Sequence, residues 1–399
     1  MSYSRKVLEW MIGITIFLTA IGYIVGKPFA EVQLNAFRIG VPILFMLALI
    51  TQPVRSIKNY FMPILGILCF VNTLLLKGNL VPLINIFLGI ILFYIIANYV
   101  EDFKPIFWCI GGVIISTAIV VLLQALGVDP ICVNEAGGHN THMVGFFGFK
   151  YVFGAWMAII TPVMLFSKRW YLGVLSAILT ICSFSFAGIT LMILAIIYCI
   201  GRFKGVKIAV GLLLTAFFIG YGSYAYFLGQ TSCGSEIKAY DHIDASGNFI
   251  GHFSGCKPCY IKGRTEKGNH ILSMSYKIKT RWHLESKILP VLFSRPLTGY
   301  GLSSFQQIGP TIFNSQTDIY GTMVDAWNEW LERGCELGFP IIGLFLFYTL
   351  STFRKFRMNK NYGLQGSLAI IPFGMLFHTY FIHTSICMLV LTLLAIWET

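Results

Sequence analysis

Long apolar runs recur along almost the whole sequence, and they constrain the fold more than any other feature. A helix needs about 20 residues to cross a hydrocarbon core of about 30 Å. Of the 399 residues, 56% are hydrophobic and only 12% are charged, which is too apolar for a water-soluble chain of this length. The runs predict an all-α polytopic membrane protein with about 12 transmembrane helices, over 8–26, 33–52, 60–76, 80–100, 104–126, 145–166, 170–184, 186–201, 206–228, 338–353, 363–378 and 383–397.

Lysine and arginine fall on one side of these spans. Short cytoplasmic connections collect such cations. With an even number of spans and a cytoplasmic N-terminus, the cytoplasmic side holds Arg5, Lys6, Arg55, Lys58, Lys104, Lys168, Arg169, Arg202, Lys204, Lys207, Arg354, Lys355, Arg357 and Lys360. We therefore expect a multi-pass plasma-membrane protein with both termini in the cytoplasm. We also expect the first apolar run to remain as a transmembrane span and not to be cleaved as a signal peptide. The net charge of +12 is then mostly topological, so no nucleic-acid partner is expected.

One long polar segment interrupts the apolar pattern. Residues 230–336 contain 11 basic and 10 acidic residues, and by alternation of the spans they face the extracytoplasmic side. The sequence thus predicts three parts. Residues 1–229 hold spans one to nine, the loop 230–337 carries the catalytic and substrate-binding residues, and residues 338–399 hold spans ten to twelve.

The cysteines divide by depth. Cys69, Cys109, Cys182, Cys199 and Cys387 lie inside predicted spans, where they act as small apolar side chains. Those in external loops are expected to form disulfides, with pairing left open among Cys132, Cys233, Cys256 and Cys259. A zinc site with His252 is a weaker alternative because the single CxxC has no second pair at the usual spacing. Free thiols are the other alternative.

Three segments combine residue types that suit chemistry at the outer face. The first is the start of span six, where Lys150 is predicted one to two turns inside the helix; Arg38 is the other intramembrane cation. Ionisable groups inside a membrane are costly and indicate function, although a lysine near a span end can reach the interface.

The second segment runs from Arg281 to the turn at Pro296. Ile288, Leu289 and Leu292 predict an amphipathic helix along the membrane surface, ended by the proline. An arginine on such a helix binds either lipid phosphate or a substrate pyrophosphate, because guanidinium offers bidentate geometry to phosphate oxygens.

The third segment leads directly into span ten. Asn328, Glu332 and Glu336 recur at helical spacing, as do Trp327 and Trp330. An aromatic belt with capping carboxylates at the start of a span is the structural alternative for this pattern.

Several short motifs occur in a fixed order around the loop. They are Arg281, then Pro296-Leu-Thr-Gly-Tyr-Gly301 before Phe305, then Asn328-Glu329-Trp330-Leu331 followed by Glu336-Leu-Gly338. In this order they resemble the O-antigen ligase and O-antigen polymerase family of bacterial envelope glycosyltransferases. Gln124-x-x-Gly127 and Gly145-x-x-Gly148 also resemble family positions. The resemblance is strongest over 270–345.

The resemblance implies a GT-C-like membrane glycosyltransferase. Such an enzyme transfers or polymerises glycan carried on undecaprenyl pyrophosphate at the outer face of the bacterial plasma membrane, among membrane lipids. It needs neither a nucleotide sugar nor a metal, so no cofactor is expected. Arg281 matches the family's loop arginine, whose implied role is to hold the pyrophosphate. The sequence leaves open whether the acceptor is a lipid A core, a growing polysaccharide or a protein.

Two positions depart from the family pattern. Trp327 stands where the ligases carry histidine, and Phe186 lies where they usually carry arginine after the seventh span. We expect Lys150 to replace the cation and His283, Glu329 or Glu336 to supply the catalytic base, with these groups converging around Arg281. His378 and His383 are further candidate bases. The remaining candidates for substrate binding are Arg38, Arg295, Trp327 and Asn328.

A second class of protein fits the same scaffold. A transporter or lipid-handling protein without chemistry usually places ionisable groups at mid-membrane and shows inverted repeats. Here the polar residues concentrate in one loop, which favours the enzyme. A protein O-oligosaccharyltransferase is the third reading.

Overall fold

The chain is helical apart from one small hairpin, within the residues that the structure describes. The computed structural model describes residues 3–21, 27–51, 60–76, 80–126, 145–147, 150–183, 185–204, 240–243, 249–253, 285–305, 308, 328–355, 361–376 and 384–399. Its helices are α1 (Tyr3–Ile21), α2 (Lys27–Thr51), α3 (Phe61–Leu75), α4 (Leu80–Tyr99), α5 (Lys104–Ala125), η1 (Gly145–Phe147), α7 (Lys150–Leu165), α8 (Trp170–Cys182), α9 (Phe186–Lys204), α13 (Glu329–Leu337), α14 (Phe339–Lys355), α15 (Tyr362–Gly374) and α16 (Thr384–Glu398). A further helix covers 285–294. The all-α prediction is confirmed for the described residues other than 240–243 and 249–253.

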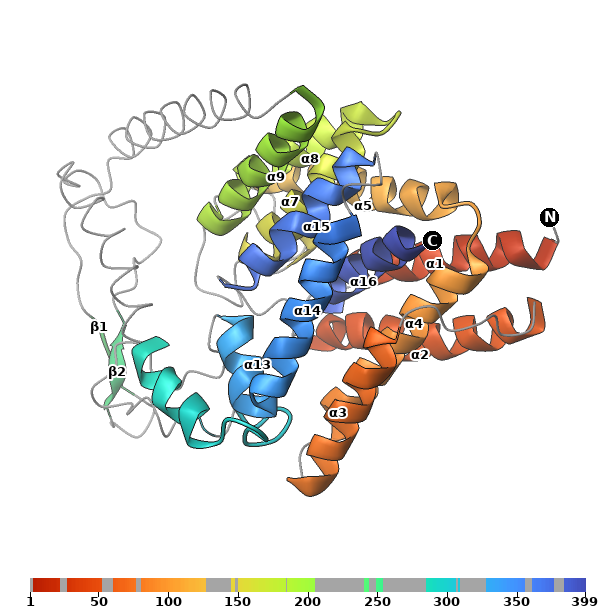
Figure 1. The fold of residues 1–399 in the computed structure, drawn as a ribbon. Helices are drawn as coiled ribbons and strands as arrows, with labels where there is room; N and C mark the ends of the chain where they lie inside the picture. The colour runs from red at the N-terminus through yellow and green to blue at the C-terminus, as the bar shows by residue number, and fades with distance from the viewer. Residues whose placement is uncertain are drawn as a thin grey trace.

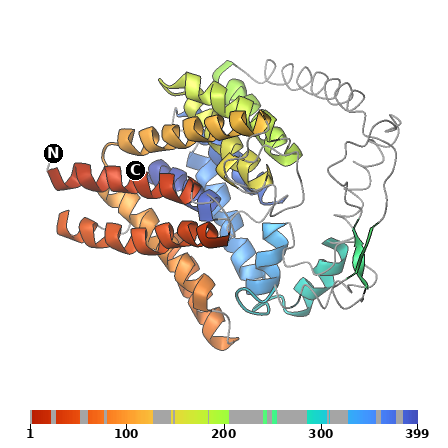
Figure 2. The same cartoon turned by 180° about the vertical axis from the view of Figure 1, so that it is seen from behind.

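The hairpin was not predicted. It pairs β1 (Tyr240–Ile243) with β2 (Phe249–Phe253) in antiparallel register within the polar segment 230–336. Both termini lie at one end of the helix bundle, and the hairpin lies at the opposite end (Figures 1 and 2).

Helix α16 lies at the centre of the bundle. It contacts α1, α2, α4, α7 and α15, and its Leu389 and Leu393 have no exposed surface. Around it, α1 packs against α2 and α5, while α7 packs against α8, α9 and α15. Most of the long apolar runs thus contribute to one large core, and two smaller clusters lie beside it.

Each predicted span that falls on described residues coincides with a helix, and the ninth, 206–228, lies outside them. The start of span six needs a correction. Helix α7 begins at Lys150, so this lysine is the first residue of the helix and not one to two turns inside it. Gly145 adopts a φ of +53°, and its N–H donates to Gln124 Oε1 at 3.1 Å, so the chain turns before the helix starts.

The cysteines predicted inside spans all lie in helices as free thiols: Cys69, Cys109, Cys182, Cys199 and Cys387. The cysteines expected to form disulfides lie outside the described residues, so their pairing stays a prediction.

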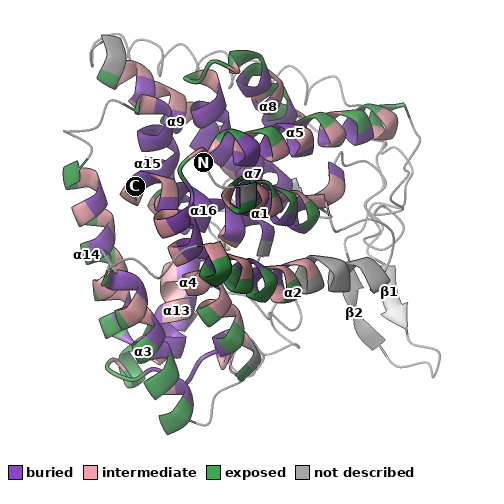
Figure 3. Cartoon of the chain, turned by 90° about the vertical axis from the view of Figure 1, so that its right-hand side faces the viewer, coloured by how far each residue is buried: buried purple, intermediate pink, exposed green. Residues whose placement is uncertain are grey.

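Large apolar side chains are exposed along the outward faces of several helices, α3 and α5 among them (Figure 3). On α5 they recur on one face, as Trp108, Ile115, Ile119 and Leu122, each about half exposed or more. In the described part of the chain, Pro82–Tyr99 and Lys104–Ala125 are long and apolar enough to cross a membrane. Six other apolar helices are shorter, at 10–17 residues.

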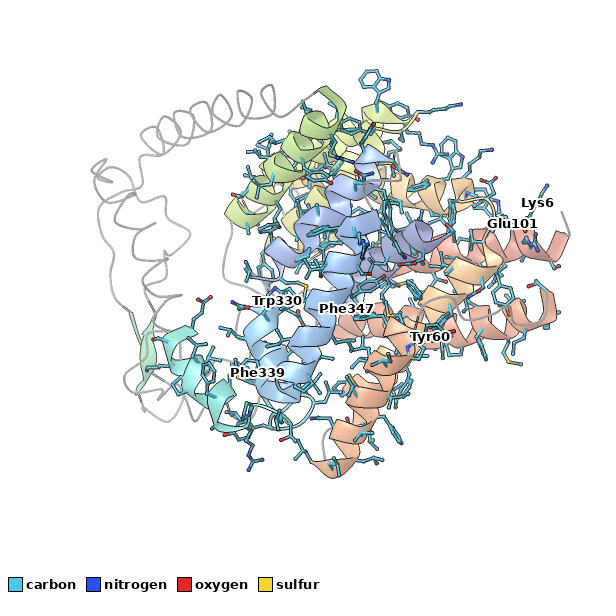
Figure 4. The ribbon with its side chains drawn as sticks, viewed as in Figure 1. Lys6, Tyr60, Glu101, Trp330, Phe339 and Phe347 are labelled. Carbon is cyan, nitrogen blue, oxygen red and sulfur yellow. The ribbon has the colours of Figure 1, made fainter. Side chains whose placement is uncertain are left out.

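Charged residues fasten α1 to the α4–α5 connection at the end of the bundle that holds the termini. Arg5 Nη1 lies 2.5 Å from Glu101 Oε1, and the buried Glu9 accepts from the backbone N–H groups of Glu101 and Asp102 at 3.1 and 3.0 Å. Lys6 and Glu101 lie at this same end (Figure 4). A buried carboxylate is tolerated here because two backbone donors satisfy it.

A glycine-rich turn over 296–301 is hydrogen-bonded to the end of α13 and to the start of α14. Tyr300 N–H donates to Cys335 O and Gly301 N–H to Glu336 O, both at 2.9 Å, which satisfies carbonyls that the end of α13 leaves open. In return, Phe339 N–H donates to Pro296 O at 2.7 Å. The motif at 296–301 and the motif at 336–338 are therefore one structural unit.

Gly299 in this unit has no room for a side chain. Its φ is +64°, and a Cβ there would collide with the carbonyl group of Glu336. We expect Gly299→Ala to lower the free energy of unfolding by about 1–3 kcal/mol, because the left-handed backbone and the collision both disfavour alanine. Gly343→Ala on α14 is the control, since a Cβ at Gly343 meets nothing within 4 Å. Thermal unfolding in lipid nanodiscs measures both variants, and equal melting temperatures would contradict the role of Gly299.

Candidate functional site

Helix α13 begins at Asn328, whose side chain caps it. Asn328 has extended backbone angles (φ −147°, ψ 106°), and its Oδ1 accepts from Leu331 N–H at 3.2 Å. Its Nδ2 donates to Glu285 Oε1 at 3.2 Å, which ties α13 to the helix over 285–294. The sequence pattern Asn328 before a carboxylate-rich first turn is typical of a helix start.

Two further hydrogen bonds hold α13 against the end of α15. Glu329 N–H donates to Met375 O at 2.8 Å, and Trp330 Nε1 donates to Pro372 O at 3.1 Å. Trp330 also lies edge-on to Phe345 of α14, with ring centroids 6.3 Å apart. The short helix is thus fixed between α14, α15 and the helix over 285–294.

Arg333 lies between two glutamates of the same helix. Glu329 precedes it by four residues and Glu336 follows it by three, so all three side chains share one face. Arg333 Nε lies 2.6 Å from Glu329 Oε1, and Arg333 Nη1 lies 2.5 Å from Glu336 Oε2. Glu329, Glu332 and Glu336 are at most 2% exposed. These four residues are called the α13 charge cluster below.

The cluster keeps Arg333 charged. Burial on its own lowers the pKa of Arg333, because it disfavours the guanidinium cation. Glu336, Glu329 and Glu332 act in the opposite direction and prevail, so the pKa of Arg333 is raised well above its ordinary value. The positive charge that pairs with Glu329 and Glu336 is therefore permanent at physiological pH.

Cys335 adjoins the cluster but is not a nucleophile. Burial first, and then Glu336 and Glu332, raise the pKa of the Cys335 thiol to about 12. A thiol that stays protonated is unreactive. Cys335 packs instead as an apolar side chain with Ile288, Leu292 and Phe305.

A cavity of about 320 Å³ opens beside the cluster. Glu332, Arg333 and Glu336 line its polar part, together with Asn85. The rest of the lining is mainly apolar and comes from α2, α3, α4, α14, α15 and α16, including Phe61, Leu65, Ile86, Phe345 and Leu391. A cavity with mainly apolar walls and a few charged residues suits a ligand that has both an apolar and a polar part.

Ser303 lines the same cavity in a strained conformation. Its φ is +65°, a region that non-glycine residues rarely adopt. Strained residues of this kind cluster at functional sites. The turn that supports α13 thus also contributes a hydroxyl-bearing residue to the cavity lining.

The structure brings some predicted site residues together. Asn328, Glu329 and Glu336 lie on α13 or at its start. Arg38 of α2 donates from Nε to Asn85 Oδ1 at 3.1 Å, which connects it to the cavity lining. Arg295 is separate from this group: it is exposed, and its guanidinium lies over the Tyr300 ring at 4.6 Å.

Other predicted site residues lie outside the described part of the chain. They are Arg281, His283, Trp327, His378 and His383, together with the side chains of Lys150 and Phe186. Their convergence around Arg281 stays a prediction.

Sequence reasoning missed Arg333 and Asn85. The signal for Arg333 is the spacing Glu329-x-x-x-Arg333-x-x-Glu336, which places one cation between two anions on a helix face. The signal for Asn85 is a polar side chain inside the apolar run 80–100. For Ser303 the sequence gives no signal, because its role depends on the backbone conformation.

Substitution of Arg333 tests how much its ion pairs contribute to the stability of the fold. We expect Arg333→Ala to lower the free energy of unfolding by about 3–5 kcal/mol, because Glu329 and Glu336 are left buried without a cation. Melting temperatures of the wild type and the variant at one pH test this.

Lys104→Ala is the matched control for that experiment. Lys104 pairs with Asp102 at 3.8 Å, and both side chains are exposed, so solvent already screens the pair. An Arg333→Ala variant that melts at the same temperature as the control would contradict the account of the cluster.

The site has to be interpreted from its own geometry and chemistry. The sequence matches no protein-family model and no curated protein.

Proposed function

We propose that the chain is a multi-pass membrane glycosyltransferase that uses glycan linked to undecaprenyl pyrophosphate. The observation that carries the proposal is the cavity beside the α13 charge cluster. Of the motifs that resemble the O-antigen ligase and polymerase family, the one at 336–338 contributes Glu336 and Leu337 to its lining, and the turn over 296–301 holds the end of α13 in place by hydrogen bonds. Its apolar walls come from the surrounding long helices.

The placement in a membrane is supported by three features. The described helices coincide with the apolar runs, which were expected to span. Their outward faces expose more apolar side chains than a water-facing surface carries in one patch. Both termini lie at one end, as an even number of spans requires (Figure 1). We propose a bacterial plasma membrane with both termini cytoplasmic and 230–337 outside.

The mainly apolar lining of the cavity favours a lipid-linked donor. An isoprenoid chain is apolar, and the part of it next to the head group suits walls formed by residues such as Leu65, Ile86 and Leu391. The sugar of its head group, and not the pyrophosphate, then lies beside Glu332, Arg333 and Glu336. No nucleotide sugar is needed, because the pyrophosphate of the donor is already a good leaving group.

The charged residues beside the cavity have different proposed roles. Arg333 is balanced by Glu329 and Glu336, so the cluster itself is a poor site for a pyrophosphate dianion. We assign the pyrophosphate to Arg281, with Lys150 and Arg38 as supporting cations. Of the candidate bases on α13, Glu336 lines the cavity and Glu329 does not. Glu336 is therefore the proposed base for the acceptor hydroxyl, and Glu329 positions Arg333.

Two readings compete with this one. A lipid-handling protein without catalytic activity would use the same cavity to bind the lipid. The ion pair between Glu336 and Arg333 favours this reading, because a paired carboxylate is a weaker base. A protein O-oligosaccharyltransferase would use the same donor with a protein acceptor. Transfer assays with a lipid A core, a polysaccharide or a protein as acceptor separate the three.

Substitution of Arg281 tests the enzyme. In membranes that contain labelled donor and acceptor, we expect Arg281→Ala to lower transfer by about 100-fold or more, because the developing charge on the leaving pyrophosphate loses its partner. Arg281→Lys should restore little, since lysine lacks the bidentate fork.

Arg264→Ala is the control, because Arg264 lies in the same loop but outside the resembling motifs. Full activity of Arg281→Ala would remove Arg281 from the mechanism. Donor binding by the wild-type chain without any transfer would instead establish the lipid-handling reading.

A further inference from the structure

The helix over 285–294 carries apolar side chains on two adjacent faces. Ile288 and Leu292, four residues apart, are 0% and 3% exposed and pack with Phe305 and Cys335. Leu289 and Phe293, one position later in each case, are 37% and 63% exposed. A helix that only needed to cover α13 would be polar on that second face.

The exposed face continues beyond the helix. Leu297 in the following turn is 74% exposed, and Phe339 at the start of α14 is 36% exposed with its ring centroid 5.5 Å from that of Phe293. Leu289, Phe293, Leu297 and Phe339 are called the 289–339 patch. Phe339 and Phe347 both lie along α14 (Figure 4), where Phe347 is 71% exposed. The patch therefore runs on into the exposed apolar face of α14.

A cation is held at the edge of the patch. Arg295 lies between Phe293 and Leu297 in sequence, is exposed, and stacks over the Tyr300 ring at 4.6 Å. The Tyr300 hydroxyl lies 2.7 Å from Ser294 Oγ, which fixes the ring. The acidic residue of the helix, Glu285, accepts instead from Asn328 Nδ2 on the side of α13. The outer side of this segment thus combines apolar groups with a positioned guanidinium.

We propose that the 289–339 patch docks on the phospholipid bilayer that surrounds α14, with Arg295 on lipid phosphate. An apolar face edged by a cation is the pattern of an interfacial helix, and continuity with α14 places it at the bilayer surface. The inference rests on the membrane placement proposed above and not on glycosyl transfer.

Docking has a consequence for the site. The same helix contacts α13 through Ile288, Leu292 and the Glu285–Asn328 hydrogen bond. Anchoring it at the lipid headgroups therefore fixes the depth of the α13 charge cluster relative to the bilayer, so that a lipid-borne head meets the cluster at a constant height.

Depth-dependent quenching tests the docking. An environment-sensitive fluorescent amino acid replaces Phe293 in the full chain, in phosphatidylglycerol nanodiscs that contain lipids with a nitroxide near the headgroup. The same fluorophore at Phe347 serves as the lipid-facing reference, and at Ser246, in the connection between β1 and β2, as the reference in the polar segment.

We expect the nitroxide lipid to quench the fluorophore at position 293 at least about twice as strongly as at position 246. The quenching at position 293 should be nearly as strong as at position 347. Arg295→Gln should reduce the quenching at 293 in phosphatidylglycerol. If the chain does not fold with the fluorophore at position 293, the fluorophore is placed at position 297 instead. Quenching at 293 by aqueous iodide as strong as at 246 would overturn the docking. Protection from both quenchers would also overturn it, because a protein surface would then cover the patch.

Discussion

The ion pairs of Arg333 are the interaction on which the site depends. Burial of three carboxylates on the nine residues of α13 is unfavourable, and Arg333 offsets part of that cost by pairing with Glu329 and Glu336. The carboxylates in turn keep Arg333 charged by raising its pKa. With these ion pairs formed, α13 packs between α14, α15 and the helix over 285–294, and its backbone ends are satisfied by Asn328 and by the turn over 296–301.

The turn and the cluster together explain why motifs far apart in the sequence occur as a set. Gly299 and Gly338 have positive φ values, and each lies where a Cβ would meet the backbone of the other segment. Tyr300 and Gly301 complete the end of α13, while Glu336 from that helix lines the cavity. Residues that look like a catalytic signature in sequence are here partly scaffold. By holding α13 in place, they position Glu332, Arg333 and Glu336 in the lining of a mainly apolar cavity.

The sequence predicted the fold better than the site, for a physical reason. Apolar runs of about 20 residues report directly on helices that must bury or expose apolar surface, so spans such as 104–126 and 338–353 agree with α5 and α14 within a few residues. The start of α7 was placed too early because the turn depends on the hydrogen bond between Gly145 and Gln124. Arg333 was missed because side-chain pairing, and not residue type, makes it central. Asn85 and Ser303 reach the cavity only through tertiary packing.

We propose that the cavity beside the α13 charge cluster holds the lipid-linked donor. Photocrosslinking tests it most directly, with benzoylphenylalanine at Ile86, which lines the cavity, and at Ile84 of the same helix, which is 52% exposed. Labelled undecaprenyl-pyrophosphate-linked glycan should crosslink saturably at position 86, with competition by unlabelled donor, and only as unsaturable background at position 84. Equal and unsaturable crosslinking at both positions would show that the donor does not enter the cavity.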